Sequence, residues 1–221
     1  MGHISREIKL LHEFLPQGVE LVAVSKFHPV SAIKEAYDAG QRLFGESRVQ
    51  ELLDKIPSLP SDIRWHFIGH LQTNKVKPII GRTALIESVD SERLIALIDR
   101  LSDEKGVVSD VLLQVHVAQE ETKFGFSPEE LIDYFRSRKF ESLKATRLCG
   151  LMGMASNTDD ISRIRSDFRA IATLRARIIE ICPDIQGFDT ISMGMSDDYP
   201  IAIEEGATLI RIGTAIFGER Q

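Results

Sequence analysis

The sequence has few of the residues that mark secreted or zinc-binding proteins. Among 221 residues there are two cysteines, one tryptophan and three tyrosines. Cys149 and Cys182 stand far apart and belong to no CxxC or CxxH pattern, which excludes a disulfide framework and a cysteine-based zinc site. Both thiols are expected in the core.

Long apolar runs are also missing. No stretch approaches the ~18 apolar residues that a membrane-spanning helix requires, and the N-terminus lacks a charged segment followed by an apolar one. We therefore expect a cytoplasmic protein with no membrane partner. The formal net charge is −6, whereas nucleic-acid-binding domains are usually basic. No nucleic-acid partner is expected.

Glycine-rich nucleotide loops are absent as well. Neither GxGxxG nor GxxxxGK[ST] occurs, and there is no short-period repeat, low-complexity stretch or linker. The chain is 43% hydrophobic and 27% charged, which is typical of a globular protein with one core. A single domain over residues 1–221 is expected.

Short apolar runs alternate with segments of helical periodicity along the whole chain. Eight runs are predicted strands: Glu20 to Val24, Arg42 to Phe44, Trp65 to Ile68, Ala84 to Ser88, Val111 to Val117, Leu148 to Gly150, Thr190 to Met193, and Leu209 to Ile212. A helix over Ser5 to Phe14 precedes them, and seven helices are expected between strands. Three of these have recognisable starts, at Pro29, at Ser127-Pro128 and at Pro200.

Alternating strands and helices predict a parallel sheet, for which two architectures compete. A doubly wound sheet would be large for this length and normally shows a phosphate loop after its first strand. A TIM barrel typically has about 250 residues and tolerates about 200. We therefore predict an α/β fold: a single TIM (β/α)8 barrel with an extra N-terminal helix, which fills the gap left where the chain stops soon after its last strand.

Chemistry in a barrel collects at the C-terminal ends of its strands. The first predicted strand continues into Ser25 and Lys26, and the parity of Lys26 matches Val22 and Val24. Loss of solvation makes the neutral form of a lysine, which attacks aldehydes, more available. A snorkelling lysine is the competing interpretation, and for an isolated lysine it is the better one.

The seventh and eighth predicted strands end in Ser192-Met193-Gly194-Met195-Ser196 and Arg211-Ile212-Gly213-Thr214-Ala215. Glycine lets backbone N–H groups approach an anion, hydroxyls add donors, and barrels often bind phosphate at these two loops. Two capped turns are the alternative. Arg211 lies inside an apolar strand, so its charge should have a partner.

Other polar residues allow more than one interpretation. Ser47 is either a helix N-cap, which the local sequence favours, or a ligand contact. His66 and His70 do not complete a metal set and lack the HExxH pattern, so no metal is expected. His28 and His116 either face the mouth of a site or are solvated or capping residues.

Six segments are more specific than any single residue: LVAVSK (21–26), FGESRVQE (44–51), WHFIGHLQTNK (65–75), GLMGMA (150–155), SMGMSDD (192–198) and RIGTAIFGER (211–220). In this order they resemble the pyridoxal phosphate homeostasis proteins, the YggS/PROSC family, over nearly the full chain. The resemblance implies a barrel similar to the N-terminal domain of alanine racemase. It also implies that pyridoxal 5'-phosphate (PLP) is held as an internal aldimine on Lys26.

The resemblance further implies that Ser192, Gly213 and Thr214 hold the phosphate and that Arg211 faces the pyridine nitrogen. Additional candidate contacts to the ring and phosphate are Met193, Ser196 and Ser47. The sequence departs from the family at Ser47, where asparagine is common, at Phe27-His28, and in the segment from 114 to 126.

The implied function is intracellular PLP homeostasis by a monomer that holds the cofactor and passes it to apo-forms of PLP enzymes. The alternatives are a PLP-dependent amino-acid racemase or lyase that uses Lys26 as a base, and a barrel for another phosphorylated metabolite. A racemase of this type needs a second domain, for which 221 residues are expected to leave no space. A cation at Arg211 also disfavours protonation of the ring nitrogen and so weakens the ring as an electron sink. No catalytic residue is assigned.

Overall fold

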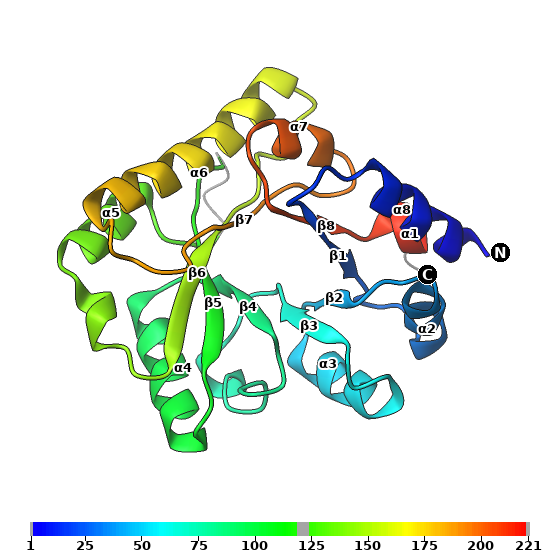
Figure 1. Ribbon diagram of the computed structural model, residues 1–221, viewed down its shortest axis with the longest axis horizontal. Coiled ribbons are helices and arrows are strands. Elements are labelled where there is room, and N and C mark those ends of the chain that lie inside the picture. Colours follow the sequence, from blue (N-terminus) through cyan, green and yellow to red (C-terminus); the bar gives the residue numbers. More distant parts are fainter. Residues whose placement is uncertain (1, 119–123, 220–221) are drawn as a thin grey trace.

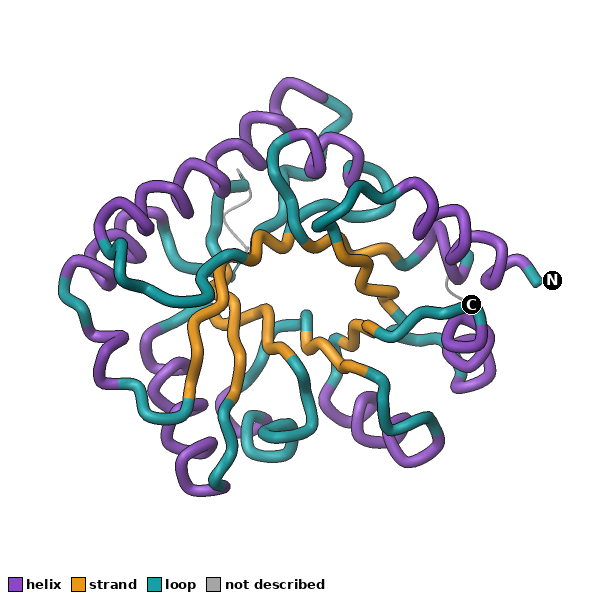
Figure 2. The backbone as a smooth tube through the Cα atoms, in the orientation of Figure 1, coloured by secondary structure: helices purple, strands orange, loops and turns teal. Residues whose placement is uncertain are grey.

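The computed structural model describes residues 2–118 and 124–219, in which eight parallel strands close a barrel in sequence order. The last strand pairs with the first, and Figures 1 and 2 show the closed ring. The strands are β1 Glu20–Val24, β2 Leu43–Glu46, β3 Arg64–Phe67, β4 Leu85–Val89, β5 Ser109–Gln114, β6 Thr146–Met152, β7 Thr190–Ser192 and β8 Leu209–Ile212. The predicted TIM barrel and its eight strands are confirmed, with shifted ends at several strands.

Helices surround the barrel (Figure 2). They are α1 His3–Phe14, α2 Val30–Asp38, α3 Val49–Lys55, α4 Glu92–Lys105, α5 Pro128–Arg136, α6 Ile161–Ile181, α7 Tyr199–Glu204 and α8 Thr214–Phe217, with 3₁₀ turns η1 Ile56–Ser58, η2 Thr73–Lys75 and η3 Lys139–Ser142. All three predicted starts are confirmed, and Pro29 is the N-cap of α2. Ser127 and Glu130 form a capping box before α5, and Pro200 lies in the first turn of α7.

The prediction of a helix in every connection is wrong between β3 and β4, where only η2 forms. Pro78 and Gly81 follow η2 and disfavour a continuous helix. Val76, Ile79 and Ile80 are nevertheless buried. This connection therefore covers the barrel with turns rather than with a helix.

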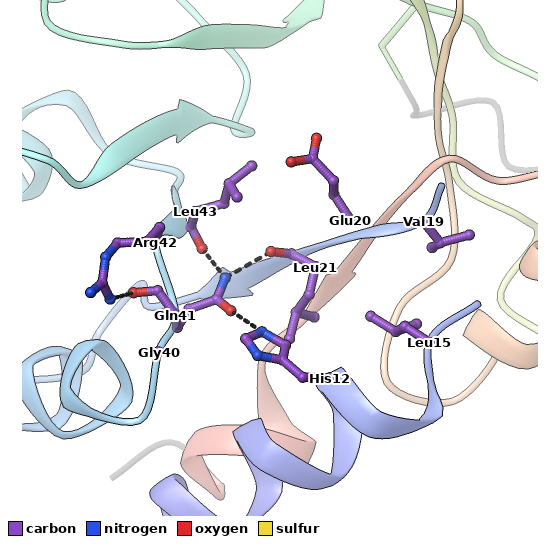
Figure 3. Close-up of a pocket in the computed structure, with 9 residues that line it drawn as sticks. All are labelled: His12, Leu15, Val19, Glu20, Leu21, Gly40, Gln41, Arg42 and Leu43. Carbon is purple, nitrogen blue, oxygen red and sulfur yellow. Dashed lines mark hydrogen bonds between the residues drawn. The ribbon is translucent and has the colours of Figure 1, made fainter. Parts of the chain in front are cut away.

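The N-terminal helix α1 packs against α2 and α8, and the three helices lie on the same side of the barrel (Figure 1). As predicted, it fills the gap beside the short last helix. Figure 3 shows how Gln41 attaches it to the start of β1 and β2. Its Nε2 donates to the carbonyl oxygens of Leu21 and Leu43 at 2.7 and 2.6 Å, and its Oε1 accepts from His12 Nε2 at 2.9 Å.

Buried side chains separate into two clusters according to strand parity. The larger cluster includes Leu21 and Ala23 and lies between strands and helices. The smaller one contains residues from six strands: Val22, Leu43, Leu85, Leu112, Met152 and Leu209. Because side chains alternate along a strand, this second cluster fills the barrel interior. The interior residue that follows on β4 is Glu87 and on β8 is Arg211, so charge lies above the apolar layer.

In the described part of the chain, no helix is long and apolar enough to cross a membrane. The same residues hold no group of three His, Cys, Asp or Glu side chains placed to bind a metal. Cys182 is buried and Cys149 is partly buried.

Candidate cofactor site

A cavity of about 210 Å³ lies at the C-terminal ends of the strands. It is lined by Val24, Lys26, Ser47, Ile68, Met154, Met195, Ser196, Asp197, Arg211, Gly213 and Thr214. Six of the eight site residues predicted from the sequence are among them: Lys26, Ser47, Ser196, Arg211, Gly213 and Thr214. A second cavity, of about 530 Å³, shares Met154, Met195 and Asp197 with the first. The closed barrel thus gathers residues from the ends of six strands in one place.

The end of β1 carries Lys26 into the cavity. Val24 lines the cavity, Ser25 is fully buried on the opposite face, and Lys26 returns to the cavity. The Ser25 N–H donates to the carbonyl oxygen of Gly45 at 3.0 Å, which continues the ladder between β1 and β2 past the last strand residue. Lys26 therefore has the parity that its sequence position predicts.

The loops after β7 and β8 meet at the cavity. Ser196 Oγ accepts a hydrogen bond from the Ala215 N–H at 3.4 Å, which joins the two loops. A Cβ atom on Gly213 would lie 3.3 Å from the carbonyl oxygen of Val24. Glycine at position 213 therefore preserves the close approach of β8 to β1. Backbone and hydroxyl groups of Ser196, Gly213 and Thr214 are a donor set suited to a phosphate.

Below the cavity, Arg211 joins a buried polar network inside the barrel. Its Nη1 donates to Ser192 Oγ at 2.5 Å and its Nη2 donates to the carbonyl oxygen of Gly153 at 3.0 Å. Ser192 Oγ donates in turn to Glu87 Oε2 at 2.6 Å, and His66 Nδ1 lies 2.7 Å from Glu87 Oε1. The partner that the sequence requires for Arg211 is therefore Glu87.

Opposing effects set the charges of this network. Burial raises the pKa of the Glu87 carboxyl, but His66, Arg211 and Ser192 together hold it below its usual range. Burial lowers the pKa of Arg211, while Glu87 and Asp198 act in the opposite direction. Because a guanidinium does not lose its proton in proteins, Arg211 brings a fixed positive charge to the base of the cavity.

Two of the predicted contacts do not line the cavity. Ser192 and Met193 are both fully buried. The Ser192 hydroxyl is engaged by Glu87 and Arg211, and Met193 packs in the outer core. Their roles as cofactor contacts stay predictions.

The alternative role of Ser47 as a helix cap is wrong. Helix α3 starts at Val49, with Arg48 as its N-cap, and no side chain caps it. Ser47 lines the cavity instead.

Five lining residues have no role predicted from the sequence: Val24, Ile68, Met154, Met195 and Asp197. Only their position could have identified them from the sequence, because each lies at or soon after the end of a strand. All five fall within the quoted segments, but an apolar side chain or an aspartate at a strand end has no chemical signature that distinguishes a lining residue from a packed or solvated one.

The remaining histidines do not line this cavity. His28 stacks on Phe217, with ring centroids 4.9 Å apart. His70 stacks on Phe124 at 3.8 Å and pairs with Asp90. His116 Nε2 is buried without a hydrogen-bond partner among the described residues. Of the unusual segment from 114 to 126, residues 119–123 lie outside the described residues.

Comparison with known proteins places this geometry in a family. Residues 1–221 match the family described as alanine racemase, N-terminal domain. The pyridoxal phosphate homeostasis protein of Aquifex aeolicus is 41% identical over 204 residues, which cover 91% of this chain and 87% of that protein.

Solved structures of related proteins agree with this family assignment. PipY of Synechococcus elongatus PCC7942 has been solved with PLP bound, and it superposes with a TM-score of 0.89 at 37% identity, covering 97% of this chain and 100% of PipY. The PLP-free structure of PipY gives a TM-score of 0.93. Alanine racemase of Clostridium difficile shares the fold, with a TM-score of 0.80 at 13% identity over 98% of this chain and 56% of the racemase. The chain therefore belongs to the alanine racemase N-terminal domain family and, within it, to the pyridoxal phosphate homeostasis proteins.

Proposed function

We propose that this protein binds PLP covalently through the Nζ of Lys26 and serves intracellular PLP homeostasis. It holds the cofactor reversibly and delivers it, as a cytoplasmic monomer, to apo-forms of PLP enzymes. The observation that carries the proposal is the shared cavity, in which Lys26 lies with Ser196, Gly213, Thr214 and Arg211.

The residues present fit the chemical groups of PLP. A primary amine is needed for its aldehyde, and Lys26 supplies it. A phosphate needs several hydrogen-bond donors, which Ser196, Gly213 and Thr214 offer. When bound, PLP supplies an electrophilic carbonyl carbon and a ring that withdraws electrons. The names of the curated relatives and the PLP-bound structure of PipY support the same assignment.

Arg211 favours holding over turnover. Its buried guanidinium lines the cavity and is held by Ser192 and Gly153. A fixed cation beside the ring nitrogen opposes protonation of that nitrogen, and an unprotonated ring stabilises carbanions poorly. We therefore propose that the protein does not turn over amino acids rapidly. Solvent deuterium entering the alpha position of amino acids at enzyme-like rates would contradict this.

Covalent binding is tested by reduction. The protein incubated with PLP should turn yellow, and borohydride should fix the cofactor mass on the peptide that contains Lys26. Lys26→Ala should abolish the adduct without unfolding the barrel. Lys34→Ala, at an exposed position on α2, is the matched control and should keep it. A colourless wild-type protein that cannot be loaded would overturn the proposal.

Delivery needs a separate experiment. The loaded protein is mixed with an apo-form of a PLP enzyme, and recovery of that enzyme's activity is compared with recovery from an equal amount of free PLP. Activity should return as Lys26 loses its adduct. A phosphatase that destroys free PLP is added to both samples. Protected transfer predicts greater recovery from the loaded protein than from free PLP, and equal recovery would contradict it. Light scattering of the loaded protein measures its molar mass and so tests whether it is a monomer.

A further inference from the structure

A buried group of charges lies on the outer side of the barrel, next to the residue that precedes Lys26. Lys55, at the end of α3, places its Nζ 2.7 Å from Glu46 Oε1 and 2.6 Å from Glu51 Oε1. Lys55 and Glu46 are both buried, and Glu51 is partly buried. None of the three lines the cavity of Lys26.

This group holds the chain on the N-terminal side of Lys26. The third hydrogen bond of Lys55 Nζ goes to the Ser25 carbonyl oxygen at 2.9 Å. Ser25 Oγ donates to Glu46 Oε1 at 2.7 Å. Each of the three N–H donors of the ammonium thus has an acceptor. Ser25 is bound through both its carbonyl oxygen and its hydroxyl.

The same group also holds the chain on the C-terminal side. The Phe27 N–H donates to Glu51 Oε1 at 2.5 Å. Phe27 has a φ of +67°, in the left-handed region that residues other than glycine rarely adopt. Such strain persists where the surroundings over-determine the backbone, and it clusters at functional sites. Here Glu51 provides the restraint, and the Arg48 guanidinium lies 4.6 Å from the centre of the Phe27 ring.

Stability alone is a weak explanation for these buried charges. Desolvation of an ion pair commonly offsets its Coulombic attraction, so apolar residues of similar volume often serve the core as well. Burial raises the pKa of the Glu46 carboxyl despite the nearby Lys55 ammonium, which shows how unfavourable this environment is for charge. What apolar residues could not do is bind the carbonyl oxygen of Ser25 and the N–H of Phe27.

We propose that Lys55, together with Glu46 and Glu51, is a positioning residue that fixes the backbone on both sides of Lys26 and so aims its amine into the cavity. The inference rests on the proposed function, because aiming matters only if Lys26 captures a carbonyl. Misplacing a reacting atom by about 1 Å can slow a reaction by about 100-fold. Covalent capture therefore depends on this group, whereas non-covalent binding of the ring and phosphate does not.

The test compares capture with binding in the full-length chain. Lys55→Met should slow formation of the borohydride-trapped adduct on Lys26 by at least about tenfold. Its affinity for pyridoxamine phosphate, which has the same ring and phosphate but no aldehyde, should stay at the wild-type level. The matched control is Lys105→Met, because Lys105 Nζ binds the Ile80 carbonyl oxygen at 2.6 Å before β4, away from Lys26. It should trap PLP at the wild-type rate.

Two results would overturn the inference. A folded Lys55→Met protein that traps PLP at the wild-type rate excludes positioning. Parallel loss of trapping and of pyridoxamine phosphate binding shows general damage to the site. If wild-type protein fails to trap PLP on Lys26, the proposed function itself fails, and this outcome is visible before any variant is compared.

A second variant serves if Lys55→Met does not fold. Glu51→Ala removes the acceptor of the Phe27 N–H, so hydrogen exchange of that amide should become faster and trapping slower. Glu51→Gln keeps an oxygen acceptor and should restore much of both. Faster exchange at Phe27 with unchanged trapping in Glu51→Ala would show that the backbone restraint does not aim Lys26.

Discussion

Glu87 on β4 and Arg211 on β8 meet in the barrel interior, where Glu87 Oε2 lies 3.8 Å from Arg211 Nη1. The two strands stand opposite each other in the eight-stranded ring. Ser192 from β7 bridges them, accepting from Arg211 and donating to Glu87. The cation at the base of the cavity is thus held from below by an acid that approaches from the far side of the barrel.

Removing the acid from this pair should be costly. In Glu87→Gln the guanidinium of Arg211 stays buried without its paired carboxylate, and breaking a buried pair in this way typically costs about 3–5 kcal/mol. Urea denaturation of the cofactor-free protein measures the loss. Glu104→Gln, which breaks the exposed pair with Arg100, is the control and should cost less than about 1 kcal/mol. Equal losses in the two variants would contradict the assigned network.

The same carboxyl should give the fold an acid-sensitive component. The folded-state pKa of Glu87 is below its ordinary value, so its contribution to stability is fully present above about pH 4.3, the ordinary glutamate pKa. It is lost as the pH falls through the lower folded-state pKa. Unfolding free energies measured from pH 6 downward should therefore fall more steeply for the wild type than for Glu87→Gln. Parallel curves would show that Glu87 does not contribute.

Gly194 should tolerate no side chain. Its φ is +92°, and a Cβ there would lie 2.6 Å from Ala202 Cβ and 3.0 Å from Tyr199 Cα. Gly194→Ala should push α7 away and lower the unfolding free energy by roughly 2–4 kcal/mol, the sum of overpacking and backbone strain. Gly206→Ala has a similar φ of +96° with open space around the added carbon, so it isolates the backbone cost. Thermal unfolding of both variants decides whether the clash matters.

Cys149 should be inert although it is only partly buried. Burial raises the pKa of its thiol to about 11, which leaves about one molecule in a thousand as thiolate at pH 8. Iodoacetamide should label neither Cys149 nor the buried Cys182 at a useful rate in the native protein, and both in urea. Cys149→Ser identifies the labelled peptide by mass. Rapid native labelling at position 149 would contradict the environment described.

Local sequence was sufficient for the elements of the fold. The continuous apolar run Leu21–Val24 and the proline and capping residues before α5 and α7 act within a few positions, so the strands and helix starts followed from them. The connection after β3 was mispredicted because its apolar residues pack as turns. Only contacts with the rest of the barrel decide between turns and a helix there.

The candidate site was partly predictable for the same reason. Position at a strand end located Lys26, Ser196, Gly213 and Thr214, because all strands of a parallel barrel point their C-terminal ends to one side. The alternation of side chains along β7 did not show that Ser192 would be buried below the cavity. Its hydroxyl is taken by Glu87, 105 positions away in the chain.

By itself, the sequence determined the strand and helix pattern, the lysine at the end of β1 and the requirement that Arg211 have a charged partner. Only the tertiary structure decided that this partner is Glu87, that six strand ends share one cavity, and that Lys55 restrains the residues on either side of Lys26. Patterns of solvation and backbone preference are local and can be found along the chain. Buried charges choose their partners only when the closed barrel removes water and brings distant strands within a few ångströms.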